Sequence, residues 1–474
     1  MLFNSIEFLI FLPTVFLLYW FIFKELKIQN LLILLASYVF YGWWDWRFLS
    51  LIILSTIVDF TIGNMIFKST NLKRKKYLLF FSLFFNLGLL GFFKYYNFFI
   101  ENWVLVWENL GITMHKSSLN IILPVGISFY TFQTLSYSID IYRNKLKPTK
   151  NFIAFASFVS FFPQLVAGPI ERATNLLPQF FKKRKFNYNI AVSGLKLILW
   201  GLVKKVVIAD NCAVYVNDIF ANYQEESGLT LILGAVFFAF QIYGDFSGYS
   251  DIAIGTGRLF GFKLMRNFNY PYFSRDIAEF WRRWHISLST WFRDYLYIPL
   301  GGSRGNKWFQ LRNVFIIFLV SGFWHGANWT FVIWGGLNAL FFLPLLLTNN
   351  NRNNLDVVAL NSLLPSVKEF LQICITFCLT TLTWVFFRAE NARHAVNYIE
   401  RIFLSHEFLP NNIAQKRMLP LLLFFIIIEW FSRKDEIVFV LKLKYRLLFY
   451  ILFVITILFY ASSSDKTSFI YFQF

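Results

Sequence analysis

The chain has 474 residues, of which 57% are hydrophobic, 21% aromatic and 15% charged. An ordinary soluble domain has about 25% charged residues, and the mean hydropathy here is +0.52. A water-soluble enzyme is therefore excluded, and lipid must cover much of the apolar surface. The net charge of +19 does not indicate nucleic-acid binding, because the basic residues fall between apolar runs, as they do in cytoplasmic loops.

The apolar runs predict an all-α protein that crosses a membrane many times. The first run begins at the N-terminus and lacks both a basic leader and a small-residue cleavage site, so we interpret it as a retained span. One crossing takes about 20 apolar residues. We therefore predict roughly 11 to 12 transmembrane helices, and the further candidates are residues 30–46, 48–67, 77–99, 121–141, 188–208, 229–247, 313–329, 331–347, 369–388, 418–432 and 446–462.

Two segments do not fit simple spanning helices. Prolines interrupt residues 151–180, and residues 250–312 mix Gly, Asp, Arg and Trp without an unbroken apolar run. We expect both to be re-entrant or interfacial, the second on the cytoplasmic side. Irregular backbone survives at membrane depth only where protein buries it or where it lines a wet cavity. The sequence thus predicts one transmembrane domain over residues 1–474, with an internal cavity.

Basic loops indicate the orientation. Clusters at residues 24–27, 68–76, 143–150 and 182–185 belong in the cytoplasm, which leaves the N-terminus outside. The acidic segments between spans, at residues 101–120 and 209–227 (the latter with Asp210), fit loops on the outer face. The basic segment at residues 388–417 argues against this scheme, and an interfacial helix there would explain it.

Residues 275–312 carry seven Arg or Lys, four Trp and one His. One interpretation is an amphipathic helix at the lipid headgroups. The other is an entrance for an anionic ligand, because arginines give bidentate phosphate contacts and glycines expose backbone amides. In that case the candidate phosphate ligands are Arg282, Arg283, Arg293 and Arg304.

The span near residue 313 places His325 beside Trp324, Gly326 and Asn328, deep in apolar sequence. Ionisable residues there are costly and usually face a cavity, so a functional role is the default hypothesis. A neutral imidazole, with an ordinary pKa of about 6.5, suits removal of a proton from a hydroxyl near neutral pH. A purely structural histidine remains the alternative.

The other histidines are weaker candidates. His285 could orient an acyl group or assist proton transfer, or it could be an interfacial histidine. His115, His394 and His406 lie in predicted loops, where solvated surface is expected. The chain has none of the usual metal-ligand motifs, so we predict no metal site.

A polar group lies at the end of the span at residues 229–247. It consists of Asp245, Ser247, Tyr249 and Asp251. Intramembrane carboxylates could couple protons in a transporter, or they could cap and cross-link helices around a cavity. We favour the structural role.

Several long motifs in one order resemble the membrane-bound O-acyltransferase superfamily. They include FFPQLVAGPIERA, QIYGDFSGYSDIAIGTGRLFGF, FWRRWHISLSTWFRDYLYIPLGG, SGFWHGANWTFVIWGGLNA and the terminal FIYFQF. Within the superfamily the pattern is similar to the alginate O-acetylation branch. That branch also contains bacterial peptidoglycan O-acetylation subunits and, more distantly, the D-alanyl transfer protein of teichoic acid modification.

The resemblance implies a helix bundle pierced by a tunnel, in which His325 of the WHG motif is catalytic and His285 matches the second histidine. It also implies that no cofactor is bound and that an acyl group moves from a cytoplasmic thioester, expected to be acetyl-CoA, to a polysaccharide acceptor outside. A separate periplasmic or extracellular partner with a serine nucleophile would complete the transfer. Trp324 and Asn328 are candidates to stabilise the oxyanion, and the expected location is the bacterial inner membrane.

Two other functions stay open on the sequence alone. A transporter or lipid-carrier flippase would also use the cavity, Asp245 and the basic inner face. A noncatalytic scaffold that docks envelope enzymes would not need His325.

Overall fold

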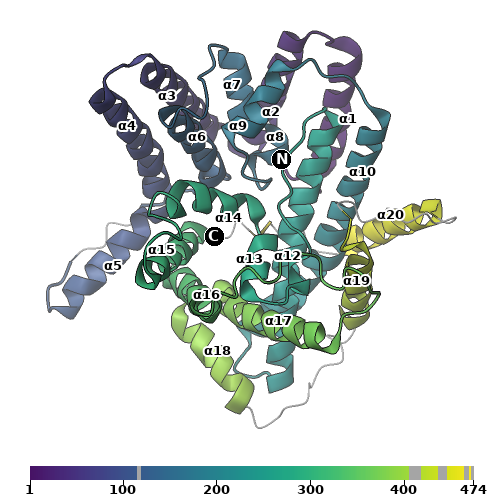
Figure 1. Cartoon of the computed structure of the whole chain (residues 1–474). Coiled ribbons are helices and arrows are strands. Elements are labelled where there is room, and N and C mark those ends of the chain that lie inside the picture. The colour runs from purple at the N-terminus through teal and green to yellow at the C-terminus, as the bar shows by residue number, and fades with distance from the viewer. Residues whose placement is uncertain (115–118, 405–417, 436–445, 464–468, 471–474) are drawn as a thin grey trace. The chain divides into compact units, whose positions relative to one another are not determined.

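The computed structural model describes residues 1–114, 119–404, 418–435, 446–463 and 469–470. Every regular element in these ranges is a helix, which confirms the all-α prediction (Figure 1). His115, His406 and most of the terminal FIYFQF motif lie outside the described residues. The chain divides into two compact units, unit 1 with Met1–Gly194 and Thr256–Met265, and unit 2 with Leu195–Gly255 and Arg266–Phe474. The single-domain prediction stays a prediction.

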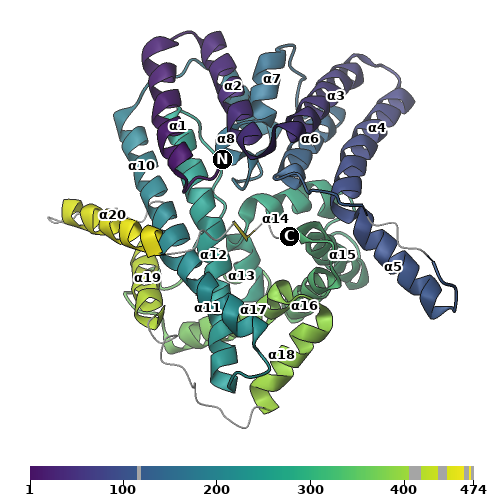
Figure 2. The same cartoon turned by 180° about the vertical axis from the view of Figure 1, so that it is seen from behind.

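Unit 1 is built mainly from the apolar N-terminal helices. Three of them, α3, α4 and α6, lie side by side (Figures 1 and 2). At their contact the buried carboxylate of Asp59 accepts hydrogen bonds from Ser82, Asn86 and Ser138, as an intramembrane charge requires. The helices of unit 1 are α1 (Ile6–Leu17), α2 (Leu26–Asp45), α3 (Leu49–Lys68), α4 (Leu72–Leu90), α5 (Tyr96–Asn109), α6 (Ile127–Tyr142), α7 (Phe152–Val159), α8 (Phe162–Leu165) and α9 (Ala173–Leu176).

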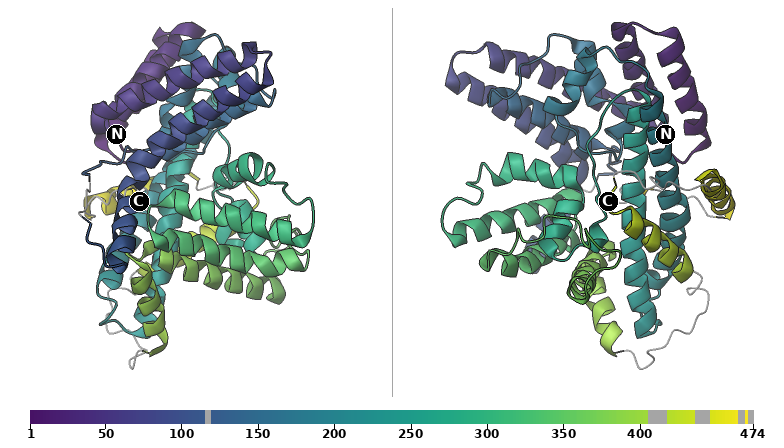
Figure 3. Two further views of the ribbon diagram at one scale, coloured as in Figure 1. Left: turned by 90° about the vertical axis from the view of Figure 1, so that its left-hand side faces the viewer. Right: turned by 45° about the vertical axis from the view of Figure 1, so that its right-hand side comes forward.

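Unit 2 contains the two candidate histidines of the sequence motifs. Its helices α15 and α16 are joined by a short loop and pack against each other, and α17 packs on α16 (Figure 3). Two helices, α10 (Tyr188–Leu202) and α12 (Gly228–Leu259), contribute residues to both units. The others are α11 (Asp210–Ala221), α13 (Ile277–Arg283), α14 (Ile286–Phe292), α15 (Lys307–His325), α16 (Trp329–Leu347), α17 (Val367–Arg388), α18 (Ala392–Leu404), α19 (Met418–Ser432) and α20 (Arg446–Ser463).

Five helical stretches of the described residues are long and apolar enough to cross a membrane, so the chain is a multi-pass membrane protein. They are Leu26–Lys68, Leu72–Asn109, Gly228–Leu259, Trp329–Leu347 and Val367–Arg388. Four shorter apolar helices accompany them, at Ile6–Ile22, Phe152–Leu165, Met418–Ser432 and Leu447–Ala461. The larger predicted number of spans and the outward N-terminus stay predictions.

The outer-face assignment of residues 209–227 stays a prediction, and most of this acidic segment is helical. After α10 the chain continues through a π-helical turn at Val203–Ala209 directly into α11. Asp210 is the first residue of α11 and is buried rather than in a loop. The reason is that Lys205, about one turn earlier, pairs with this carboxylate and replaces water as its partner.

The two segments with irregular sequence are broken into short helices. Residues 151–180 form α7, α8 and α9, and residues 154–171 are all buried, so protein atoms cover this backbone. Residues 250–312 contain the end of α12, then irregular chain, α13 and α14. This interruption is as expected, whereas the depth of either segment in a membrane stays a prediction.

The basic segment after α17 begins with the amphipathic helix α18. Ala395 and Tyr398 are buried on one side, while Phe403 and Leu404 are exposed at its end. Such a helix fits the interfacial interpretation of residues 388–404.

The end of α12 and the loop after it are held within unit 1 by polar anchors. Tyr19 donates to the carbonyl of Phe260, and the buried carboxyl of Glu171 accepts from the backbone N–H of Met265. Asn175 also donates to Glu171. Glu171 lies outside the candidate spans, and burial raises its pKa from 4.5 to about 7. The carboxyl is therefore neutral in the folded protein at a pH at which the unfolded chain would ionise it.

We expect this group to make stability depend on pH. Between pH 4.5 and 7 the folded state keeps a proton that the unfolded state releases, so the free energy of unfolding falls as pH rises through this window, by up to about 3 kcal/mol. Glu171→Gln should flatten this dependence, measured as the apparent Tm in detergent from pH 5 to 8. Glu101→Gln, at an exposed site of unit 1, should keep the wild-type slope. Equal slopes for all three proteins would contradict the prediction.

Candidate active site

His325 is the last residue of α15 and is 4% exposed. Its ring centroid lies 4.9 Å from that of Trp324, 5.2 Å from that of Trp334 on α16 and 5.2 Å from that of Phe387 on α17, all in edge-on arrangements. Three helices thus enclose the imidazole with aromatic rings. Such a wall restricts the orientation of the ring and its contact with bulk water.

The loop after His325 is short, and its residues both end α15 and begin α16. Gly326 ends α15 with extended backbone, and a Cβ at this position would lie 2.1 Å from the ring of Phe331. Asn328 is the N-cap of α16, where its side chain accepts from the N–H of Thr330. The WHGAN sequence is therefore a tight helix-to-helix connection.

Two glycines allow the backbones of α15 and α16 to touch. A Cβ at Gly322 would lie 2.2 Å from the carbonyl oxygen of Phe331, and a Cβ at Gly335 would lie 2.3 Å from the carbonyl oxygen of Phe318. No side chain fits at such distances, because backbone cannot move aside as the end of a side chain can. These contacts fix the end of α15, and with it His325.

A matched pair of variants tests this packing. We expect Gly335→Ala to separate the two helices and to destabilise the protein by about 1–3 kcal/mol, the usual effect of overpacking. Gly336→Ala is the control, because its Cβ would meet only the side chain of Leu319 at 3.8 Å. The apparent Tm and the acyl transfer rate should fall in the first variant and stay at wild-type values in the second. The same result for both would contradict the role of Gly335.

His285 lies in the link between α13 and α14, outside the candidate spans, and is 1% exposed. Its ring centroid lies 4.6 Å from that of Phe246 on α12 and 6.1 Å from that of Trp324. Burial lowers the pKa of His285 to about 3. Both candidate histidines therefore border the indole of Trp324, and His285 is a neutral imidazole at physiological pH.

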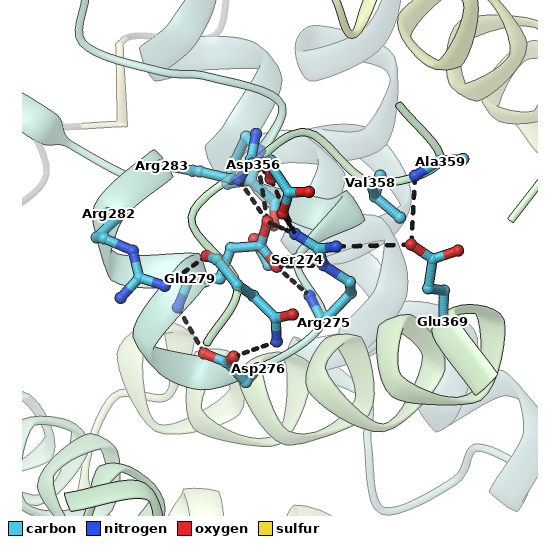
Figure 4. A network of polar contacts seen from close by, with 12 residues as sticks. Ser274, Arg275, Asp276, Glu279, Arg282, Arg283, Asp356, Val358, Ala359 and Glu369 are labelled. Carbon is cyan, nitrogen blue, oxygen red and sulfur yellow. Dashed lines mark hydrogen bonds and ion pairs between the residues drawn. The ribbon is translucent and has the colours of Figure 1, made fainter. Parts of the chain in front are cut away.

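Arg283, a predicted phosphate ligand, is buried and belongs to an ionic network centred on Glu279 instead of an open surface (Figure 4). Its guanidinium lies 2.8 Å from Glu279, which is 1% exposed and also pairs with Arg275 at 3.1 Å. Arg275 reaches Asp356 at 3.0 Å and Glu369 at 3.5 Å. The network ties α13 to the chain between α16 and α17, and only Arg283 of its members was singled out from the sequence.

The remaining predicted arginines are more accessible. Arg282 donates to two backbone carbonyls of the loop after α16, while Arg293 pairs with Asp294 at 2.8 Å and is 58% exposed. Arg304 is exposed in the glycine loop before α15. Phosphate binding by these arginines stays a prediction, and Arg293 and Arg304 have the freer guanidinium groups.

A second ionic network, not predicted from the sequence, lies where α12 meets the π-helical turn. Lys205 is 2% exposed and lies 2.7 Å from Asp210 and 2.9 Å from Asp245. Gly201 and Gly248 permit this approach, since a Cβ at either would lie within 2.7 Å of the other's carbonyl oxygen. Asp245 thus cross-links helices, in agreement with the structural interpretation.

The neighbouring Lys204 pairs in the same way. Its ammonium lies 3.1 Å from Asp251 and 3.3 Å from Glu429 on α19, and the hydroxyl of Tyr243 donates to Glu429. Lys204, Asp251 and Tyr243 line a cavity of about 20 Å³ together with Arg266, and it has room for about one water. The sequence pattern could not pair these groups, because the partners are up to 225 residues apart.

The two candidate oxyanion donors differ in their surroundings. Trp324 is buried between the rings of both histidines. The amide nitrogen of Asn328 donates to the carbonyl of Glu390 at 2.8 Å, in addition to the capping contact of its oxygen. Asn328 is therefore occupied in joining α16 to the end of α17, and an oxyanion role for either residue stays a prediction.

His394 is half-buried on α18, where its ring stacks on Tyr223 with centroids 4.6 Å apart. The expectation of a solvated loop is thus wrong for this histidine, because α18 packs on the end of α11. In the part of the chain that the structure describes, no group of three or more His, Cys, Asp or Glu could hold a metal ion.

The family model for membrane-bound O-acyltransferases matches residues 38–356. This range includes both candidate histidines and most of the helices described above. The chain belongs to this family. It is therefore an O-acyltransferase, and the recognition made from the sequence motifs is confirmed.

Curated relatives of this family cover most of the chain. A probable alginate O-acetylase of Pseudomonas aeruginosa is 42% identical over 404 residues, which are 85% of this chain and 75% of the relative. A peptidoglycan O-acetyltransferase of Helicobacter pylori is 37% identical over 430 residues, 84% of this chain and 79% of the relative. A teichoic acid D-alanyltransferase of Streptococcus thermophilus is 32% identical over 224 residues, 44% of this chain and 54% of the relative.

Proposed function

We propose that this O-acyltransferase moves an acetyl group from cytoplasmic acetyl-CoA to an acceptor hydroxyl for the O-acetylation of an exported or cell-envelope polysaccharide, with His325 as general base. The observation that carries the proposal is the burial of the WHG histidine among three aromatic rings at the contact of α15, α16 and α17. The names of the Pseudomonas and Helicobacter relatives support acetyl as the acyl group and a polysaccharide of the alginate or peptidoglycan type.

The reaction needs two proton transfers, one to His325 and one from it. As the hydroxyl oxygen attacks the thioester carbonyl carbon, the His325 imidazole takes the hydroxyl proton. The carbon–sulfur bond then breaks, and the imidazolium returns the proton to the leaving thiolate, so the products are an ester and a free thiol. General-base catalysis of this kind contributes about 10²–10⁴-fold to the rate.

The tetrahedral intermediate carries a negative oxygen that needs a hydrogen-bond donor. Trp324 is the better placed of the two candidates, because its indole lies between the two imidazoles and Asn328 already bonds to a carbonyl of the neighbouring helix end. Removing one oxyanion donor commonly lowers the rate by about 10²–10³-fold.

The proposal places the chain in the bacterial inner membrane with its N-terminus outside. Arg293 and Arg304 are candidates to attract the phosphates of the donor at the cytoplasmic face. A periplasmic or extracellular partner with a serine nucleophile would receive the acetyl group and pass it to the polymer.

Deletion of the gene in its own bacterium tests the function. The O-acetyl content of one envelope or exported polysaccharide, released by mild alkali and quantified, should fall to background, and the wild-type gene should restore it. Unchanged ester content in every such polymer would refute the proposal. A change in polymer export without loss of acetyl groups would instead favour a transporter.

A further inference from the structure

The chain at residues 267–269 runs beside the link that carries His285. The N–H of Ile286 donates to the carbonyl of Asn267 at 2.8 Å, and the N–H of Asn269 donates to the carbonyl of Arg283 at 2.9 Å. His285 lies between these two bonds with φ of +43° and ψ of +53°, in the left-handed region. Non-glycine residues in this region are strained and cluster at functional sites. The two backbone hydrogen bonds therefore hold the backbone of His285 in a conformation that it would not adopt alone.

The side chain of Asn267, which is fully buried, faces His285 through its carbonyl oxygen. Its Oδ1 lies 3.2 Å from the backbone nitrogen of Ser287, 2.8 Å from the hydroxyl of Ser287 and 3.1 Å from Nδ1 of His285. A backbone N–H can only donate, so the amide atom that faces it must be the oxygen. The amide nitrogen then faces the hydroxyl of Ser250 at 3.0 Å and donates to it.

This orientation fixes the tautomer of the imidazole. A carbonyl oxygen cannot donate, so the contact of Nδ1 with Asn267 is a hydrogen bond only when Nδ1 carries the hydrogen. The hydroxyl of Ser287 also lies 3.4 Å from Nδ1, but its contact with Oδ1 of Asn267 is shorter, at 2.8 Å, so we assign its hydrogen to Asn267 and the Nδ1 hydrogen to the imidazole. Burial lowers the pKa of His285 to about 3, so the ring is neutral and Nε2 bears a lone pair.

Nε2 of His285 is buried and has no hydrogen-bond partner among the described residues. The rings of Phe246, Phe268 and Trp324 lie around its imidazole. Nearly all buried polar atoms in native proteins are hydrogen-bonded. An oriented, unpartnered acceptor beside Trp324 therefore marks a place for a donor on a bound molecule.

We propose that Asn267 is a positioning residue for acyl transfer, which fixes His285 as the Nδ1–H tautomer so that its Nε2 accepts a hydrogen bond from the substrate. This inference rests on the proposed function. The group that binds Nε2 must be an N–H or O–H hydrogen-bond donor, and each substrate has such a group. The thioester has the amide N–H groups of its pantetheine arm, and the acceptor has a sugar hydroxyl next to the one that attacks.

Three variants separate tautomer control from folding. Asn267→Leu has a similar size but no acceptor, so the transfer rate should fall by about 10–100-fold, as expected when one buried hydrogen-bonding group is left without its partner. Asn267→Asp keeps the oxygen that accepts from Nδ1 and should retain most activity at alkaline pH, where the imidazole stays neutral beside a carboxylate. Ser250→Ala removes only the partner of the amide nitrogen and should stay close to wild type.

The steady-state constants of Asn267→Asp and Asn267→Leu identify the substrate. A rise in KM for acetyl-CoA means that the pantetheine arm donates the hydrogen bond to Nε2. A rise in KM for the polysaccharide means that a sugar hydroxyl donates it. Loss of activity to the same extent in folded Asn267→Leu and Asn267→Asp at every pH would overturn the proposal, as would full activity in folded Asn267→Leu.

A spectroscopic measurement covers the case in which Asn267→Leu does not fold. In wild-type protein with ¹⁵N-labelled histidine, the signals absent from His285→Gln should show Nδ1 protonated and Nε2 unprotonated. The opposite tautomer would overturn the proposal. His325→Ala is assayed in parallel, because retained transfer in that variant would refute the proposed function itself and leave the tautomer measurement standing.

Discussion

His325→Ala should lower acyl transfer by about 10²–10⁴-fold, because it removes the group proposed to take the proton from the acceptor hydroxyl. The ring contacts of His325 with Trp334 and Phe387 also stabilise the site, so the amount of protein in the membrane and its apparent Tm are measured with the rate. A loss of rate that exceeds any loss of folded protein assigns the effect to chemistry. The rate is measured as free thiol released from acetyl-CoA in the presence of acceptor.

His394→Ala is the matched control. This imidazole is also in unit 2 and also contacts an aromatic ring, but on α18 and away from the WHG motif. We expect its transfer rate to equal that of the wild type. Equal rates in His325→Ala and His394→Ala would remove His325 from the mechanism and favour a scaffold, for which the histidine is dispensable.

Lys205→Met should destabilise the protein by about 3–5 kcal/mol, the usual effect of removing one partner of a buried ion pair. The variant leaves the carboxylates of Asp210 and Asp245, both buried, without their shared cation. We expect low yields in the membrane and a much lower apparent Tm. Lys434→Met changes the same charge at an exposed site of unit 2 and should have little effect.

A second substitution checks the mechanism of this destabilisation. In Lys205→Met with Asp245→Asn, one of the two buried charges is removed and the amide oxygen can still accept from the backbone N–H of Ile470. The double variant should therefore be more stable than Lys205→Met alone. Additive destabilisation would mean that the ion pair is not the cause. It would also reopen the transporter alternative, in which Asp245 carries protons.

The helices were predicted well from the sequence where a long apolar run indicates them. A run of about 20 apolar residues forms a helix because lipid or an apolar core leaves its backbone no other partner, and α2, α3, α16 and α17 follow the predicted ranges closely. By contrast, α12 starts as predicted but continues to Leu259, beyond the predicted end at residue 247. His325 was also found from local sequence, because an ionisable group within an apolar run is itself the signal, whereas His285 lies outside such a run and was supported by the family motif.

Long-range pairing could not be predicted from the sequence. Lys204 and Glu429 are 225 residues apart and show no pattern that joins them, and the same holds for Arg275 and Asp356. Asn267 was missed for another reason, since an asparagine in an irregular segment looks like a turn residue. Its role is visible only once the backbone of Ile286 pairs with it and brings the amide to Nδ1 of His285.

The most direct test of the central claim uses purified protein in sealed vesicles, with labelled acetyl-CoA on one side and a hydroxyl acceptor on the other. We expect labelled ester on the far side and free thiol on the near side in equal amounts with the wild type, and neither product above background with folded His325→Ala. Equal ester formation by both proteins would contradict the account.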